Sequence, residues 1–185
     1  MRFLGRTSIM LALAVFLTAG AQTAIAASAS EIAKKAHKAL DALCKKEQSA
    51  KLLRTEAHAI LVFPGIYKAG FIVGGAGGDG ALLKGDKPVA YYRSVAASYG
   101  LQAGVQKFGY ALFFMNDDAL AYLDKSDGWE IGVGPSVVVV DAGVGKSLTT
   151  TTGRSDVYAF IFSQKGLMAG IGIQGSKITK ISPDK

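Results

Sequence analysis

The chain has little of what catalytic and metal centres are built from. It contains one cysteine, Cys44, and two histidines, His37 and His58, in 185 residues. A single cysteine excludes an internal disulfide, and one cysteine with two distant histidines forms no metal-ligand cluster. We therefore expect neither a metal site nor a cofactor. Cys44 lies in an apolar helical pattern, which favours a small packing residue over a nucleophile.

Long hydrophobic runs are also missing. The apolar stretch at residues 9–17 is too short to span a bilayer comfortably. Arg2 and Arg6 precede it, and a small-x-small pattern ending at Ala26 follows, as in a secretory signal peptide. Ala21 stands where a lipoprotein signal would need cysteine. We therefore expect cleavage after Ala26, export without a lipid anchor, and residence in a periplasm, in solution or peripherally on a membrane.

Acidic residues are fewer than basic ones. If residues 1–26 are a signal peptide, residues 27–185 form a single domain by length. Without the two leader arginines, the 21 Lys and Arg become 19 against 14 Asp and Glu, a net charge of +5. This excess favours anionic partners such as lipid headgroups or anionic polysaccharide. Export makes nucleic acid the least expected of them.

Helical periodicity is confined to the start of this domain and one short later segment. Apolar residues recur at helical spacing over residues 28–46, with Ser30 as the expected N-cap. A second helix is expected over residues 47–57. Asn116-Asp117-Asp118 is expected to cap a short helix over residues 119–123.

From His58 onward the pattern is typical of strands. We expect strands over residues 59–63, 63–83, 89–97, 101–115, 129–140, 156–162, 167–173 and 177–181, with a turn at 84–88. Strands that follow one another through short connections predict an antiparallel sheet. The expected fold is α+β: a strongly curved, barrel-like antiparallel sheet of about seven strands, with N-terminal helices and one short inserted helix.

The most glycine-rich segment, residues 63–83, imitates a phosphate-binding loop. Gly75, Gly77 and Gly80 satisfy G-x-G-x-x-G, but the residues that follow lead into a turn and leave no room for the required helix. We interpret these glycines as marking bulges, sharp curvature or close approach of another backbone. Residues 143–147 end like a nucleotide-binding P-loop, but Val140 replaces its first glycine, which favours a simple turn.

The lysines of the first expected helix are the best functional lead. They are Lys34, Lys35, Lys38, Lys45 and Lys46. A helix with an apolar stripe and a basic side can lie on an anionic membrane, where each lysine contributes about 1 kcal/mol. The alternative is that Ile32, Leu40 and Leu43 pack on the sheet and that the lysines are simply solvated.

Motifs across the domain resemble the SYLF domain family. The resemblance is carried by Ala59-Ile60-Leu61-Val62-Phe63-Pro64, Lys68-Ala69-Gly70-Phe71-Ile72-Val73-Gly74-Gly75, residues 77–82, Gly132-Val133-Gly134, Val157-Tyr158-Ala159-Phe160 and residues 163–170. It covers about residues 32–181.

The resemblance implies a phospholipid-binding module that favours anionic headgroups such as phosphoinositides. In eukaryotic members a basic amphipathic N-terminal helix is implicated in membrane contact, and residues 31–46 match that type. Lys68, inside a matching segment, is the best single candidate for a phosphate contact. Because most bacteria make no phosphoinositides, the expected ligand is cardiolipin, phosphatidylglycerol or a lipopolysaccharide phosphate. The actin binding of some eukaryotic members does not carry over to a periplasm.

We therefore expect an exported, non-enzymatic protein that binds anionic phospholipid through the five helix lysines and Lys68, with the apolar side of the helix on acyl chains. The alternative is a structural or interaction protein of the cell envelope that joins protein partners through exposed sheet edges. An enzyme is a third reading, which a buried polar cluster around His58 would favour.

Overall fold

The computed structural model describes residues 27–125, 128–140, 155–165 and 173–184. The expected signal peptide, the turn at 143–147 and nearly all of the expected strand at 167–173 lie outside these residues. The elements are α1 (Ala29–Lys46), α2 (Gln48–Glu56), β1 (Ala59–Lys84), β2 (Lys87–Phe114), α3 (Asp117–Ala121), the 3-10 turn η2 (Tyr122–Asp124), β3 (Trp129–Glu130), β4 (Val137–Val140), β5 (Val157–Lys165) and β6 (Lys177–Ile181). Ser28, rather than the expected Ser30, caps α1, because its hydroxyl accepts from the Glu31 amide.

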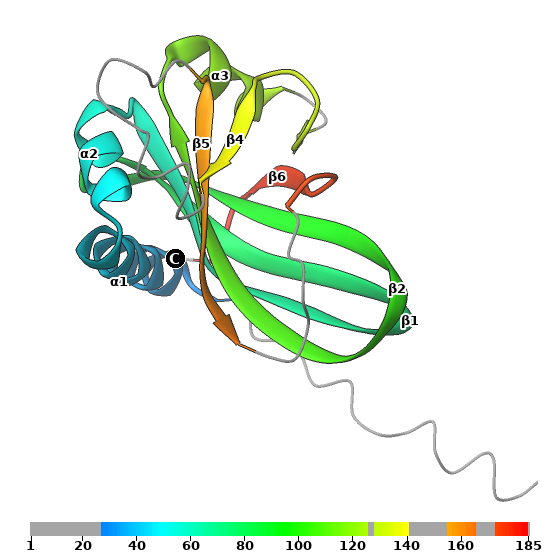
Figure 1. Cartoon of the computed structure of the whole chain (residues 1–185). Coiled ribbons are helices and arrows are strands. Elements are labelled where there is room, and N and C mark those ends of the chain that lie inside the picture. Colours follow the sequence, from blue (N-terminus) through cyan, green and yellow to red (C-terminus); the bar gives the residue numbers. More distant parts are fainter. Residues whose placement is uncertain (1–26, 126–127, 141–154, 166–172, 185) are drawn as a thin grey trace, which may run out of the picture.

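Two very long strands organise the sheet. β1 and β2 pair antiparallel from Ala59 opposite Phe114 to Lys84 opposite Lys87. β2 also pairs with β5 and β6, so that the described sheet has the order β3-β6-β2-β5-β4 with β1 on β2. Figure 1 shows the β1–β2 ribbon curling away from α1 and α2. The expected α+β class and strongly curved sheet are confirmed. The described residues hold six strands rather than about seven, because neighbouring expected strands are continuous.

One strand pair contradicts the expected antiparallel sheet. β4 runs parallel to β5, with Val137 opposite Val157 and Val140 opposite Phe160. Sixteen residues, 141–156, separate these two strands, and a parallel connection needs about a dozen or more. The expected strand over 129–140 is also divided into β3 and β4. Gly132 and Gly134 lie between them with positive φ, which is incompatible with a continuing ladder.

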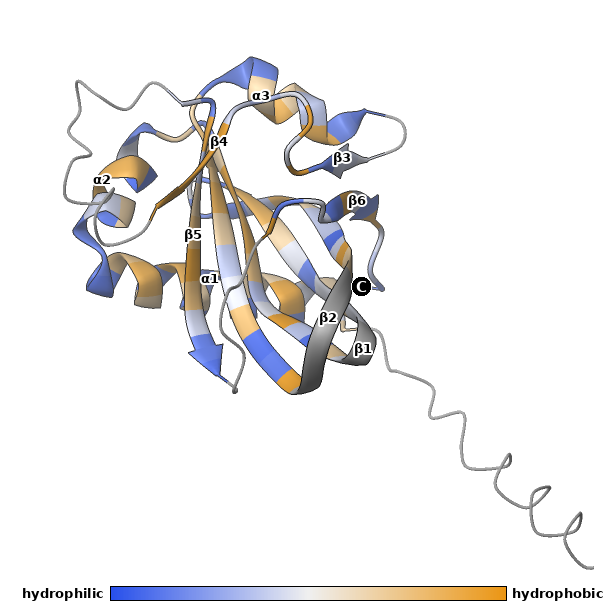
Figure 2. Ribbon diagram, turned by 45° about the vertical axis from the view of Figure 1, so that its right-hand side comes forward, coloured by the Kyte–Doolittle hydropathy of each residue, from blue (hydrophilic) through white to orange (hydrophobic). Residues whose placement is uncertain are grey.

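Both faces of the sheet are buried where its strands cross the centre of the molecule. On one face, the apolar stripe of α1 packs with sheet residues such as Ile60, Val62 and Phe113. On the other, β1 and β2 side chains pack with α3, η2 and Trp129. Along β5 the residues change from hydrophobic to hydrophilic toward its carboxyl end (Figure 2). The apolar side of α1 is therefore covered by protein, and the expectation that it contacts acyl chains is wrong.

The glycines of β1 allow the strand to double back on itself. A Cβ placed on Gly80 would lie 2.5 Å from the carbonyl oxygen of Val62 and 2.7 Å from the Phe63 ring. A Cβ on Gly78 would collide with the carbonyl oxygen of Gly65. The two ends of β1 are thus in backbone contact, which is the close approach that the glycine pattern indicated.

Asp156 connects three elements at the top of the sheet. Its carboxylate accepts hydrogen bonds from the Ser136 amide (2.9 Å), the Ser136 hydroxyl (2.8 Å) and the Asn116 side chain (2.9 Å). Asn116 itself caps α3. These bonds, the Ser136 amide first, hold the pKa of Asp156 below its usual range.

Asp156→Ala is expected to lower the free energy of unfolding by about 1 to 2 kcal/mol at pH 7, because bonds to a charged acceptor are lost. The folded pKa is lowered, so this stabilisation is present above the unfolded pKa of about 3.9 and is lost as the pH falls through the folded value. Urea denaturation from pH 7 to pH 3 should show the difference from wild type shrinking below about pH 4. Asp118→Ala, an exposed neighbour, is the control. A pH-independent difference would contradict this account.

Candidate functional site

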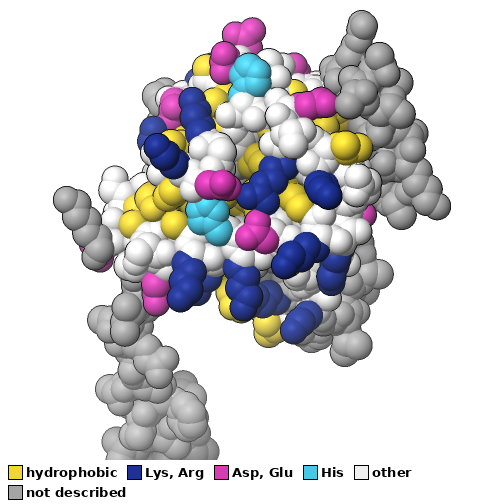
Figure 3. All heavy atoms as spheres, turned by 90° about the vertical axis from the view of Figure 1, so that its left-hand side faces the viewer, with side chains coloured by type: hydrophobic (Ala, Val, Ile, Leu, Met, Phe, Trp, Pro, Cys, Tyr) yellow, Lys and Arg dark blue, Asp and Glu magenta, His cyan; other side chains and the backbone are white. Residues whose placement is uncertain are grey.

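The five predicted lysines of α1 are all exposed and lie away from its buried stripe. Lys34, Lys38 and Lys45 are separated by four and seven positions, about one and two helical turns, and therefore form a line. Lys35 and Lys46 lie on one flank of that line. Figure 3 shows Lys and Arg side chains gathered on the face that carries α1 and α2, with carboxylates among them. The five lysines thus lie on an exposed surface of α1.

Within the described residues a single ion pair involves these lysines, although the carboxylates of Glu31 and Asp41 lie on the same side of α1. Lys35 lies 3.9 Å from Glu31, and both side chains are exposed, so the pair is weak. No ion pair joins Lys34, Lys38, Lys45 or Lys46 to another described residue. We call the exposed side of α1 with its five lysines the α1 basic face.

Arg54 of α2 has a different, structural role. Its guanidinium binds Asp41 of α1 at 2.8 Å and Asp86 of the β1–β2 turn at 3.0 Å. The bond to Asp41 is the main reason why the pKa of Arg54 is raised. Arg54 thereby links α1 to the sheet and contributes no unpaired charge to the α1 basic face.

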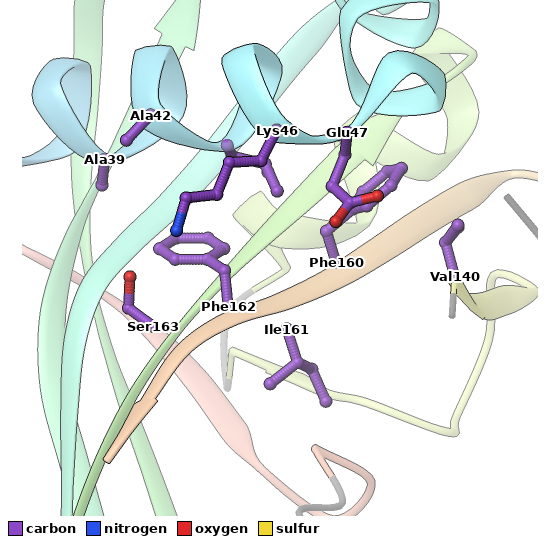
Figure 4. A pocket seen from close by; sticks show the side chains of 10 residues that line it. Ala39, Ala42, Lys46, Glu47, Val140, Phe160, Ile161, Phe162 and Ser163 are labelled. Atoms are coloured by element: carbon purple, nitrogen blue, oxygen red, sulfur yellow. The ribbon is translucent and has the colours of Figure 1, made fainter. Parts of the chain in front are cut away.

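A groove of about 320 Å³ runs between the flank of α1 and β5. Its α1 side carries the small residues Ala39 and Ala42, and its β5 side carries Phe160 and Phe162. Figure 4 shows Lys46 reaching from the end of α1 toward Phe162. The groove thus combines apolar side chains with the charged groups of Lys46 and Glu47 and the hydroxyl of Ser163. Nothing in the spacing of either segment alone indicates it, because α1 and β5 are more than a hundred residues apart.

Lys68 does not lie with the helix lysines. It is half-buried on β1 and lines a second cavity together with Ile66, Phe108 and Tyr110. Those three residues belong to the core on the face of the sheet opposite α1. The six predicted binding residues therefore form two groups, five on α1 and Lys68 alone on the other face.

His58 and Cys44 show no catalytic arrangement. The His58 Nδ1 atom lies 2.9 Å from Asp117, but the two side chains are 45% and 83% exposed. This is a surface pair, not the buried polar cluster that would favour an enzyme, and it lowers the pKa of Asp117. Burial raises the pKa of the partly buried Cys44 thiol, as expected of a packing residue rather than an activated nucleophile.

No described helix combines the length and the apolar character needed to cross a bilayer. His, Cys, Asp and Glu side chains do not gather anywhere in the described part of the chain as three or more possible metal ligands.

A family model described as Ysc84, "Las17-binding protein actin regulator", matches residues 95–183. These residues carry a Ysc84, or SYLF, domain. The resemblance drawn from the motifs is thereby confirmed over that range. No curated protein matches the chain. The Ysc84 match begins within β2 and includes β3 to β6, whereas α1 and β1 precede it. The description of Ysc84 names binding and regulation, and it is coarsely consistent with a lipid- or protein-binding role rather than with a reaction.

Proposed function

We propose that the protein binds anionic phospholipid at membrane surfaces through the α1 basic face. The observation that carries the proposal is a row of unneutralised lysines on a helix whose other side is anchored in the core. The Ysc84 match supports a binding function of this broad kind. We also propose that residues 1–26 direct export, so that the surface would meet the lipids of a bacterial envelope.

Anchoring changes how such a helix would act. A free amphipathic helix inserts its apolar side among acyl chains, but α1 has that side against the sheet. It therefore presents a rigid cationic surface, and the attraction is mainly electrostatic. At about 1 kcal/mol for each lysine near the membrane, four or five lysines could supply several kcal/mol. The groove beside Lys46 has a mixed lining, and its Phe160 and Phe162 side offers apolar contact to a single acyl chain.

Sedimentation with vesicles tests the proposal. The protein should sediment with phosphatidylglycerol or cardiolipin vesicles and much less with phosphatidylcholine vesicles. Raising the salt from 0.05 M to 0.5 M should release most of it, because screening shortens the reach of each charge. Binding that ignores both lipid charge and salt would exclude this mechanism.

A protein-interaction role in the envelope is the second candidate. β4 is the outermost strand on one side of the described sheet. It consists of four valines, of which Val139 is exposed. An apolar strand at a sheet edge can pair with another chain. This candidate predicts self-association or capture of a protein partner in light scattering, together with no vesicle binding.

A further inference from the structure

The concave side of the curled β1–β2 ribbon holds a small cavity with both polar and apolar lining. It measures about 110 Å³ and is lined by Ile66, Lys68, Ala76, Ser94, Ala96, Ala97, Phe108, Tyr110, Gln174 and Ser176. At about 30 Å³ for each water, it has room for about three or four water molecules. That is room for one small polar ion, such as a single phosphate group.

Hydroxyl groups line the cavity at buried positions that apolar side chains normally occupy. Ser94 and Ser176 are only 3% and 5% exposed. The Tyr110 hydroxyl, which burial keeps protonated by raising its pKa, donates to Ser94 Oγ at 2.7 Å. Ser94 therefore accepts from Tyr110 and retains its own proton for a further acceptor. Buried hydroxyls are costly unless such an acceptor is supplied.

Lys68 is the charged residue of this lining, and no described carboxylate neutralises it. β1 and β2 together contain a single acidic residue, Asp79. Both Asp79 oxygens are held by Arg93, at 2.7 Å and 3.0 Å. Apart from Lys68, the cavity lining holds only hydroxyls, the Gln174 amide and apolar groups, so the cavity carries one positive charge that an anion could balance.

We propose that this cavity binds a small oxyanion, namely phosphate or a phosphate monoester, with Lys68 supplying the charge and Ser94 and Ser176 donating hydrogen bonds. Lysine acts as a point charge toward phosphate, and hydroxyl donors complete the coordination. The site is independent of the α1 basic face, because it lies on the opposite side of the sheet. The monoester could be free in solution or the headgroup of a phosphatidate.

Calorimetric titration with inorganic phosphate and with glycerol 3-phosphate, against chloride at equal ionic strength, tests the site. Wild type should bind one equivalent. Lys68→Met should weaken binding at least tenfold, and Ser176→Ala should weaken it severalfold. Lys107→Met is the matched control, because Lys107 lies one register position away and contacts the exposed Tyr67 ring. No binding by wild type, or equal affinity for the Lys68 and Lys107 variants, would overturn the proposal.

Vesicles distinguish the two sources of the monoester. If the ligand is a lipid, Lys68→Met should lose the preference for phosphatidic acid over phosphatidylglycerol vesicles. If the ligand is free phosphate, Lys68→Met should weaken phosphate binding in the titration but leave the vesicle preference unchanged. General binding to anionic vesicles should persist in this variant, since the α1 basic face is intact. Failure of the cavity proposal is therefore separable from failure of the proposed function.

Discussion

Gly80→Ala is expected to destabilise the protein by about 3 kcal/mol, although alanine has a better strand propensity than glycine. The added methyl group would lie 2.5 Å from the carbonyl oxygen of Val62 and 2.7 Å from the ring of Phe63. A carbonyl in the buried core of the same strand cannot move without shifting its ladder partners. Overpacking of this kind costs about 1 to 3 kcal/mol or more. Urea denaturation followed by circular dichroism should show a lower midpoint with an unchanged slope.

Gly75→Ala provides the matched control on the same strand. A Cβ at Gly75 meets only the Ala96 carbonyl oxygen, at 3.9 Å, which is ordinary contact. Removing the flexibility of a glycine there should be neutral or stabilising by up to about 1 kcal/mol. Gly78→Ala should resemble Gly80→Ala, because its methyl group would meet the Gly65 carbonyl. In the double variant Gly78→Ala/Gly80→Ala, the loss in the free energy of unfolding approaches the whole stability of a typical domain.

If Gly75→Ala and Gly80→Ala were equally stable, the two ends of β1 would not approach each other as the structure shows. The curl of the ribbon, and with it the concave cavity, would then have to be revised. A tolerated Gly78→Ala would carry the same meaning for the contact with Gly65.

The general form of this fold follows from local patterns. The apolar stripe of α1 identifies its buried side, and strand glycines indicate close backbone approach before any partner is known. The alternation of Ile60 and Val62 with Leu61 and Phe63 assigns the two faces of β1 correctly. These local patterns could not show which distant segment packs against each surface. The parallel pairing of β4 with β5 and the groove beside Lys46 depend on such contacts.

A register shift in β1 explains why Lys68 lies apart from the other predicted binding residues. By simple alternation from Val62, Lys68 would lie on the α1 side of the sheet. The register shifts between Phe63 and Ile66, where three steps on β1 correspond to two on β2. One extra residue moves every later side chain to the opposite face. Ile66 therefore joins the same core cluster as Phe63, and Lys68 lines the cavity beside it.

Replacing Lys34, Lys38 and Lys45 together by glutamine is expected to weaken binding to anionic vesicles about 100-fold at low salt. Each lysine near the membrane contributes about 1 kcal/mol, and about 3 kcal/mol corresponds to roughly two powers of ten. Lys35 is kept, because its pairing with Glu31 would complicate the comparison. The three side chains are exposed on α1, so thermal unfolding should change little. The measurement is a vesicle titration at several salt concentrations.

The control for this variant removes the same charge elsewhere. Lys107, Lys165 and Lys177 are exposed lysines of β2, β5 and β6, and their replacement by glutamine lowers the net charge equally. If the α1 basic face is the contact surface, the control should lose only a few-fold in affinity. The two variants should converge with wild type as salt screens the charges. Equal losses of vesicle affinity in both variants would show that overall charge, rather than α1, directs binding. The anchored helix would then have only a structural role.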